Sequence, residues 1–217
     1  DYAAQWLKRL GPAERVGFVP GNHDAYVRGG ADRARQAYGA YAGGETLTEA
    51  HFPYVRRISE VAILGCTSAV ATPPFISAGR FDLPQADRLA KCLDVLGEAG
   101  FFRTILIHHP PVKGLPLRQR LYGGHRFRDV VIGHGAELVL HGHTHQSTLN
   151  AIEGGLRPVP VVGVTSASTA PGNLQPPARY NLFQIQRLSE GWSCTMREFG
   201  FQRIGDDIVQ RLQVRII

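Results

Sequence analysis

The feature that most constrains the fold is a repeated pattern in which a short apolar run is followed directly by a polar cluster containing histidine. The pattern occurs three times, with residues 16–19 before Gly21-Asn22-His23-Asp24, residues 104–107 before His108-His109-Pro110, and residues 137–140 before His141-Gly142-His143-Thr144-His145. Short apolar runs of this kind predict buried strands. Parallel strands bring their carboxyl ends to one edge of a sheet. We therefore expect one site built from three separate segments.

The rest of the chain predicts how this sheet is continued. Helices are expected at residues 2–10, within 25–44, from Asp82 to a stop supplied by Gly97 and Gly100, and at 127–132. Further strands are expected at residues 54–58, 61–66, 148–152, 158–164, 180–185, 192–197 and 209–216. Strands and helices that alternate before a run of strands alone predict a mixed α/β sheet with an antiparallel continuation.

Composition limits the classes of protein to which this chain can belong. A chain of 217 residues with 43% hydrophobic and 19% charged residues predicts a single globular domain over 1–217. Its apolar stretches are far too short to predict a transmembrane helix, and we expect no membrane partner. Three widely spaced cysteines, Cys66, Cys92 and Cys194, do not form a disulfide or zinc pattern, which favours a reducing compartment and a cytoplasmic location. The net charge of +6 suits anionic partners.

Metal binding is the chemistry that the histidine clusters favour. Five of the nine histidines fall in two clusters, at positions 108, 109, 141, 143 and 145. Imidazole is a common ligand of transition metals, and Gly142 is expected to let the backbone turn so that the neighbouring rings converge. The alternative is that these are loop histidines with ordinary hydrogen bonds. One cluster alone would favour that alternative, whereas the two together favour a metal.

The three clusters, in this order, resemble the downstream motifs of the calcineurin-like metallophosphoesterase superfamily, in particular its cyclic-nucleotide-phosphodiesterase-like branch. The resemblance covers about residues 15–146. It implies an α/β fold of the αββα type, a sandwich of two mixed sheets flanked by helices. It also implies a metal-dependent phosphoric ester hydrolase that acts on small phosphate esters, most plausibly phosphodiesters such as cyclic nucleotides or glycerophosphodiesters.

The resemblance also implies the metal ligands. Asn22, His108 and His143 match ligands of one ion, and His145 matches a ligand of a second. The family's His-x-Pro spacing favours His108 over its neighbour His109. The implied cofactors are two divalent ions, with Mn or Fe favoured over Zn or Co. Such a pair of ions can activate a hydroxide for in-line attack on phosphorus.

The catalytic side chains implied by the resemblance lie in the first cluster. His23 matches an imidazole that contacts the phosphate and protonates the leaving oxygen, and Asp24 is expected to orient it. The two histidines left over, His109 and His141, are expected to be structural or to lie behind the ligands. No substrate-binding residue is assigned.

The chain departs from the family at its beginning. The Asp-x-His and Gly-Asp-x-x-Asp/Asn motifs, which supply the remaining ligands and the bridging carboxylate, do not occur, and Gly205-Asp206-Asp207 has neither the place nor the spacing. We therefore expect that an N-terminal portion of the natural protein is absent from this chain, with weak metal binding and poor catalysis as the consequence. The other explanation is a naturally degenerate member.

Two further functions stay open. A nuclease of the same family is suggested by the basic charge, and a non-catalytic scaffold by the incomplete motifs. The basic segment 113–128 is either a flap that contacts phosphate or a solvated surface, and the second interpretation is slightly favoured. Neither the oligomeric state nor the physiological substrate follows from the sequence.

Overall fold

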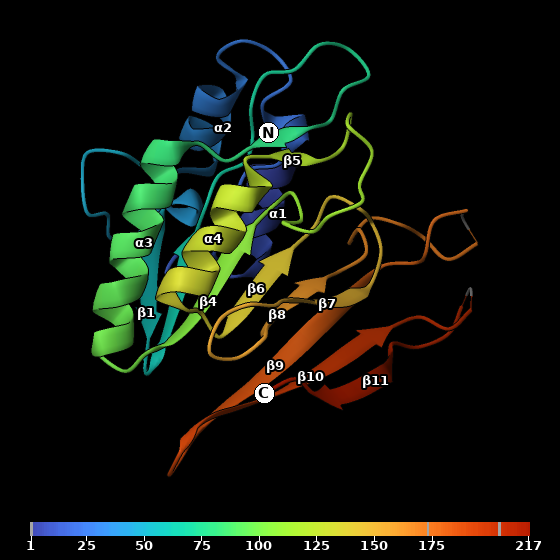
Figure 1. The fold of residues 1–217 in the computed structure, drawn as a ribbon. Helices are drawn as coiled ribbons and strands as arrows, with labels where there is room; N and C mark the ends of the chain where they lie inside the picture. Colours follow the sequence, from blue (N-terminus) through green and yellow to red (C-terminus); the bar gives the residue numbers. More distant parts are fainter. Residues whose placement is uncertain (1, 173, 204) are drawn as a thin grey trace.

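The computed structural model describes residues 2–172, 174–203 and 205–217 (Figure 1). The helices are α1 (Tyr2–Leu10), α2 (Gly30–Tyr38), α3 (Leu83–Glu98) and α4 (Gly124–His134), with short 3-10 turns η1 (Asn22–Asp24) and η2 (Gly39–Ala42). The strands are β1 (Tyr54–Ile58), β2 (Val61–Gly65), β3 (Gly79–Arg80), β4 (Phe102–Ile107), β5 (Leu121–Tyr122), β6 (Leu138–His141), β7 (Thr148–Ile152), β8 (Val159–Gly163), β9 (Arg179–Leu188), β10 (Gly191–Gly200) and β11 (Val209–Arg215).

The main sheet has six strands in the order β1-β2-β4-β6-β8-β7. Its four central strands run parallel, and β1 and β7 close the two edges in antiparallel pairings. The carboxyl ends of β2, β4, β6 and β8 therefore lie along one edge of the sheet. The polar clusters that follow β4 and β6 are brought to this edge by the strand order.

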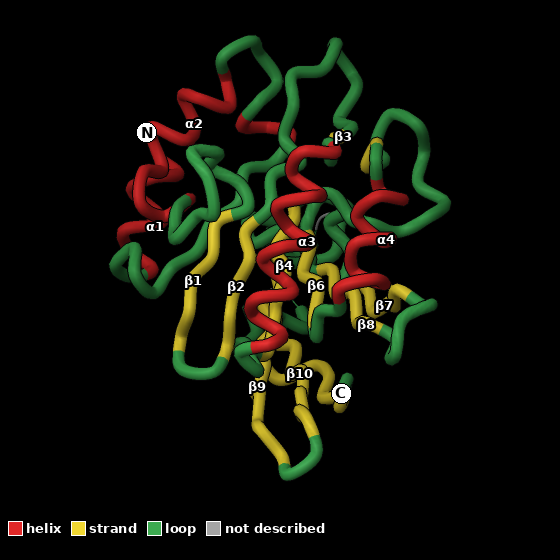
Figure 2. The backbone as a smooth tube through the Cα atoms, turned by 60° about the vertical axis from the view of Figure 1, so that its left-hand side comes forward, coloured by secondary structure: helices red, strands yellow, loops and turns green. Residues whose placement is uncertain are grey.

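A second sheet forms another layer. Strands β9, β10 and β11 pair in the order β11-β10-β9 and lie beyond the main sheet in Figure 1, and Figure 2 shows β9 and β10 from a second side. Helices α3 and α4 cover the opposite face of the main sheet. The expected α/β class with two sheets and flanking helices is confirmed. In detail the second sheet is antiparallel throughout, where a mixed sheet was expected.

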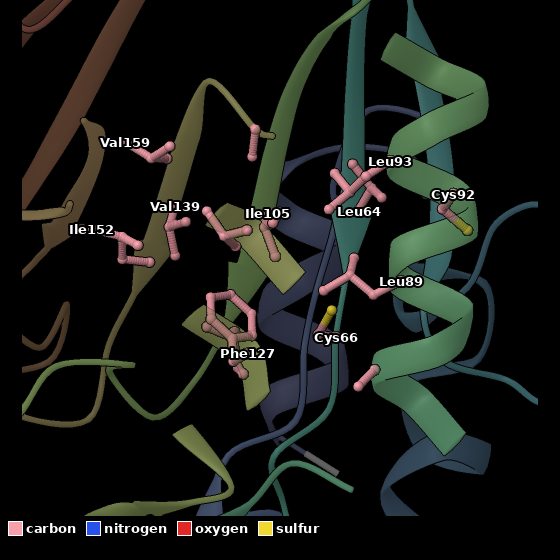
Figure 3. Close-up of a cluster of buried hydrophobic side chains, with 14 of the residues drawn as sticks. Leu64, Cys66, Leu89, Cys92, Leu93, Ile105, Phe127, Val139, Ile152 and Val159 are labelled. Carbon is pink, nitrogen blue, oxygen red and sulfur yellow. The ribbon is translucent and has the colours of Figure 1, made fainter. Parts of the chain in front are cut away.

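Each face of the main sheet buries its own core. On the helical face, Leu64, Ile105 and Val139 pack against Leu89 of α3 and Phe127 of α4 (Figure 3). On the other face, residues of the main sheet meet side chains of the second sheet, with Phe102, Leu138 and Val162 contributed by the first and Cys194 and Met196 by the second. A strand directs successive side chains to opposite faces, so both layers follow from strands that are apolar on both sides.

Local signals placed the long helices well. Asp82 caps α3 as expected, because its Oδ1 accepts a hydrogen bond from the backbone N of Gln85 at 2.9 Å. Such a cap contributes about 1 kcal/mol. Helix α4 begins earlier than the expected residue 127, because Gly123, with a φ of 80°, turns the chain directly into it.

The expected strand at residues 16–19 is wrong. The segment is irregular, because its backbone groups bind partners outside any ladder. The N–H of Phe18 donates to the carbonyl of Tyr41 at 2.8 Å, and the Phe18 carbonyl accepts from the Tyr54 hydroxyl at 2.9 Å. The Arg56 guanidinium donates to the Val16 carbonyl at 2.8 Å.

Two other expectations concern cysteines and membranes. All three cysteines are free, and all three are buried. Within the described ranges no helix is long and apolar enough to cross a bilayer.

Candidate metal centre

The candidate site lies at the carboxyl edge of the main sheet. Strand β4 ends at Ile107, so His108 and His109 project from its end, and β6 ends at His141, two residues before His143. The turn η1 brings Asn22 to the same place, although no strand precedes it. The structure thus brings together the three segments that the sequence pattern predicts.

Three donor atoms converge at the centre. The Oδ1 atom of Asn22 lies 2.9 Å from Nε2 of His108 and 3.2 Å from Nδ1 of His143. Asn22 is buried, with 3% of its surface exposed. Donor atoms that share one ion at about 2.1 Å lie roughly 3.0–3.4 Å apart in octahedral or tetrahedral sites. The spacing and the mixed N and O donors of these residues therefore fit a single divalent transition metal.

The backbone around the centre leaves room for the Asn22 and histidine side chains to converge. A Cβ atom on Gly21 would lie 2.7 Å from Cε1 of His108, so a side chain there would displace the imidazole. The expected turn at Gly142 is found one residue later, since His143 and His145 adopt left-handed φ angles of 68° and 55°. Residues other than glycine rarely adopt this conformation, and such strain is concentrated at functional sites.

His109 has a different environment from His108, although the two are adjacent. Its Nδ1 lies 2.7 Å from the Ser68 hydroxyl and its Nε2 lies 2.9 Å from the carbonyl of Ser77. The ring is completely buried, and a Cβ on Gly79 would fall 2.3 Å from its Nδ1. Both ring nitrogens are engaged, which supports the expectation that His109 is structural.

The imidazoles of the centre are held neutral. Burial is the main cause that lowers the pKa of His108 to about 3, and the surrounding histidines add repulsion. Burial likewise lowers the pKa of His109 to about 4 and reduces the pKa of His143. A neutral imidazole keeps the lone pair that a metal requires. The centre is therefore ready to bind a cation without first losing protons near neutral pH.

His23 and Asp24 lie beside the centre but do not contact each other through a hydrogen bond. His23 is exposed, and its ring packs edge-on against Tyr26 with 4.9 Å between ring centroids. The Asp24 carboxylate accepts from the backbone N of Gly21 and from the Tyr38 hydroxyl, each at 2.8 Å. One oxygen closes the turn and the other binds α2, and these contacts give no support to the expectation that Asp24 orients His23.

The second metal position has fewer candidate ligands. The imidazoles whose ligand atoms lie within 4.8 Å of one another are those of His108, His109 and His143. His145 is exposed and lies outside this group. Across the described part of the chain, no Asp or Glu belongs to a group of this kind.

Four residues that support the centre were missed by the sequence analysis. The Asn22 amide donates from Nδ2 to the hydroxyl of Tyr26, which leaves Oδ1 directed at the histidines. Tyr38 supports Asp24, and two serines, Ser68 and Ser77, hold the ring that neighbours His108. The four-residue spacing from Asn22 to Tyr26 was a usable signal. The other contacts join distant segments, and no local pattern reveals them.

The basic segment 113–128 borders the centre through its backbone. The Ser77 N–H donates to the Arg118 carbonyl at 2.8 Å, and a hydrogen bond to the Gln119 backbone raises the pKa of His143 against the effect of burial. The guanidinium of Arg120 stacks on the Tyr122 ring at 4.5 Å from its centroid. The segment therefore touches residues of the centre through its backbone, while its arginine side chains are largely exposed.

Comparisons with known proteins give the family. Residues 1–147 match the model of the calcineurin-like phosphoesterase family. No curated protein matches the chain. Similar solved structures include TT1561 of Thermus thermophilus, with 16% identity over 82% of this chain and 72% of that one and a TM-score of 0.42. Another is Vps29 of Entamoeba histolytica complexed with zinc, with 9% identity over 84% and 75% of the two chains and a TM-score of 0.35. The family model spans more than half of the sequence, and the chain belongs to the calcineurin-like phosphoesterase family.

Proposed function

We propose that this chain hydrolyses phosphodiesters with the help of divalent metal ions bound at the carboxyl edge of the main sheet. The observation that carries the proposal is the convergence of the Asn22 Oδ1 atom with ring nitrogens of His108 and His143, at 2.9 and 3.2 Å. The exposed imidazole of His23 lies next to this convergence in the chain and in space. A cation and a proton donor would thus face the same substrate.

The proposed roles combine the convergence of three donor atoms with the resemblance to the family's motifs. Asn22, His108 and His143 would hold one ion, and His145 is the proposed protein ligand of a second. Mn or Fe suits this set of nitrogen and oxygen donors better than a metal that prefers thiolates. When bound, the ions would supply positive charge beside the phosphoryl oxygens and make water more acidic.

The proposed reaction needs a proton at the leaving oxygen. Water adds its oxygen to phosphorus, the bond from phosphorus to the alcohol oxygen breaks, and that oxygen takes a proton from His23. The proton that the attacking water releases balances the one that His23 gives up. Because His23 is exposed, it can recover its proton from solvent between turnovers.

Hydrolysis of bis(4-nitrophenyl) phosphate with added Mn²⁺ tests the proposal. We expect Mn-dependent release of nitrophenol. With methyl benzyl phosphate, whose weakly acidic alcohol leaves only with a proton, we expect turnover to fall by about 100-fold or more in His23→Ala, the contribution typical of a general acid. The matched control is His134→Ala, because His134 lies at the end of α4 and pairs with Asp94 on the surface. A chain that holds its metal and releases no nitrophenol would refute the proposal.

One observation favours a second candidate, a non-catalytic scaffold that uses the same edge as an interaction surface. Among the residues described, the grouped ligand atoms come from imidazoles alone, without a carboxylate to bridge two ions. A scaffold predicts that His23→Ala leaves every measured property of the metal-loaded chain unchanged. A loss of hydrolysis in that variant would dismiss the scaffold.

A further inference from the structure

A second feature beside the metal centre is an apolar cavity that the reaction described above does not use. Its volume is about 480 Å³. It is lined by Tyr26 and Val27 on one side and by the loop of residues 72–77 on the other. Ligand sites in proteins are typically concave, mostly apolar and of this size. None of the residues that line this cavity is charged, so its chemistry suits a neutral group.

The cavity is joined to the centre at two points. Tyr26 accepts a hydrogen bond from the Asn22 amide, and its ring lies edge-on to the His23 ring at 4.9 Å between centroids. On the opposite wall, the Ser77 carbonyl lies 2.9 Å from Nε2 of His109. A group in the cavity would therefore lie beside the imidazole that faces the leaving oxygen.

Phe75 is the unusual residue of this cavity. The residue is 98% exposed and its φ is 65°, a left-handed angle that a residue other than glycine seldom adopts. An exposed ring contributes almost nothing to folding by burial, so folding does not explain why phenylalanine is held in this conformation. The loop is closed by the Ile76 N–H, which donates to the Pro73 carbonyl at 3.2 Å. An exposed aromatic ring on a strained, closed loop is a reason to infer a ligand.

We infer that this cavity binds the alcohol portion of the substrate and selects phosphate esters whose leaving group is aromatic. The inference rests on the proposed function for the identity of the bond that breaks. Tyr26 and Phe75 offer two aromatic rings, and Pro73 and Ile76 offer apolar contacts around them. Aromatic rings prefer edge-on or offset stacking against one another. A leaving group with a charged or small aliphatic structure would gain little there.

The test compares two esters whose alcohols have similar acidity, so that the chemical step is equally difficult for both. These are methyl benzyl phosphate and methyl ethyl phosphate, followed by release of benzyl alcohol and of ethanol. We expect kcat/KM for the benzyl ester to exceed that of the ethyl ester by about tenfold, the value of stacking one ring. Phe75→Ala should remove most of this preference. Leu156→Ala is the matched control, because Leu156 is also completely exposed but lies near Arg103 and Glu137, away from the centre.

Binding without turnover separates this inference from the proposed function. Benzylphosphonate and ethylphosphonate are titrated by calorimetry into the Mn-loaded chain and into Phe75→Ala. Tighter binding of benzylphosphonate that is lost in Phe75→Ala supports the inference even if neither ester is hydrolysed, in which case the proposed function fails alone. Equal binding of both phosphonates, or a preference that Phe75→Ala leaves intact, overturns the inference whether or not the esters are hydrolysed. A docking surface for another protein would give that second result.

Discussion

Replacing each of the two adjacent histidines by alanine should separate metal binding from folding. In His108→Ala the centre loses one of three convergent donors, with the hydrogen bond between its Nε2 and Asn22. Loss of residues that merely support a ligand costs about 10- to 100-fold in metal affinity, so loss of a ligand should cost more than about 100-fold, or about 2.7 kcal/mol. Removing a half-buried ring should cost only about 1–2 kcal/mol of folding stability.

The opposite result is expected for His109→Ala. The variant removes a completely buried ring and its two hydrogen bonds, so the Ser77 carbonyl loses its ring partner and the Ser68 hydroxyl keeps only the bond that it accepts from the backbone N of residue 109. Deletion of a buried ring and unpaired polar groups together should cost about 4 kcal/mol. For a chain of this size, that corresponds to a decrease in Tm of roughly 12 °C. Metal affinity should fall by less than about tenfold, since neither nitrogen is available to an ion.

Two measurements on each variant decide which of the two histidines binds the metal and which supports the fold. Mn²⁺ affinity is measured by competition with a metallochromic chelator at a temperature where both variants are folded by circular dichroism, and Tm is measured by thermal unfolding in the presence of EDTA. The reasoning predicts a large loss of affinity in one variant and a large loss of Tm in the other. If His109→Ala lost the metal while keeping its Tm, the assignment of the ligand would be reversed and our account of the two rings would be wrong.

Three more predictions concern metal binding, stability in acid and DNA binding. Tyr26→Phe should weaken Mn²⁺ binding about tenfold, because the Asn22 amide loses the acceptor that orients it. Tyr122→Phe is the control, and equal Mn²⁺ affinities in the two variants would contradict the role of Tyr26. Acid should destabilise the fold: the pKa of His109 is about 4 when folded and 6.5 when unfolded, so the unfolded chain binds the proton more tightly. The neutral His109 ring therefore contributes about 3 kcal/mol to the free energy of unfolding above a pH of about 6.5, and this contribution is lost as the pH falls towards about 4. Urea unfolding between about pH 7 and pH 4 measures this loss, which should be smaller in His109→Ala, and an equal pH dependence would refute it. Duplex DNA should bind weakly and be released between about 50 and 200 mM salt, as expected of a net charge of +6 without a dedicated site, whereas retention at the higher salt concentration would favour the nuclease.

The sequence determined those elements whose causes are local. Helix α3 has its cap at Asp82 and its apolar face at helical spacing, and the hairpin of β1 and β2 has its turn at Ser59 and Glu60. Both could be predicted because each signal lies within a few residues of the element that it forms. The positions of the histidine clusters at the ends of apolar runs were equally local, and they were enough to indicate the fold class and the candidate site.

Strand pairing and hydrogen bonds between distant segments were decided by the tertiary structure. Residues 16–19 have the composition of a strand, but a strand exists only when a neighbour supplies its hydrogen bonds, and here Tyr41, Tyr54 and Arg56 take the backbone groups instead.

The different environments of His108 and His109 also depend on contacts between distant segments. The two side chains are chemically identical and adjacent, so composition and periodicity cannot distinguish them. They differ because one ring meets Asn22, 86 positions away in the chain, and the other meets Ser68, 41 positions away. The sequence offered only the family's His-x-Pro spacing for this choice, because the contacts that distinguish the two rings form only when the parallel sheet brings its carboxyl ends together.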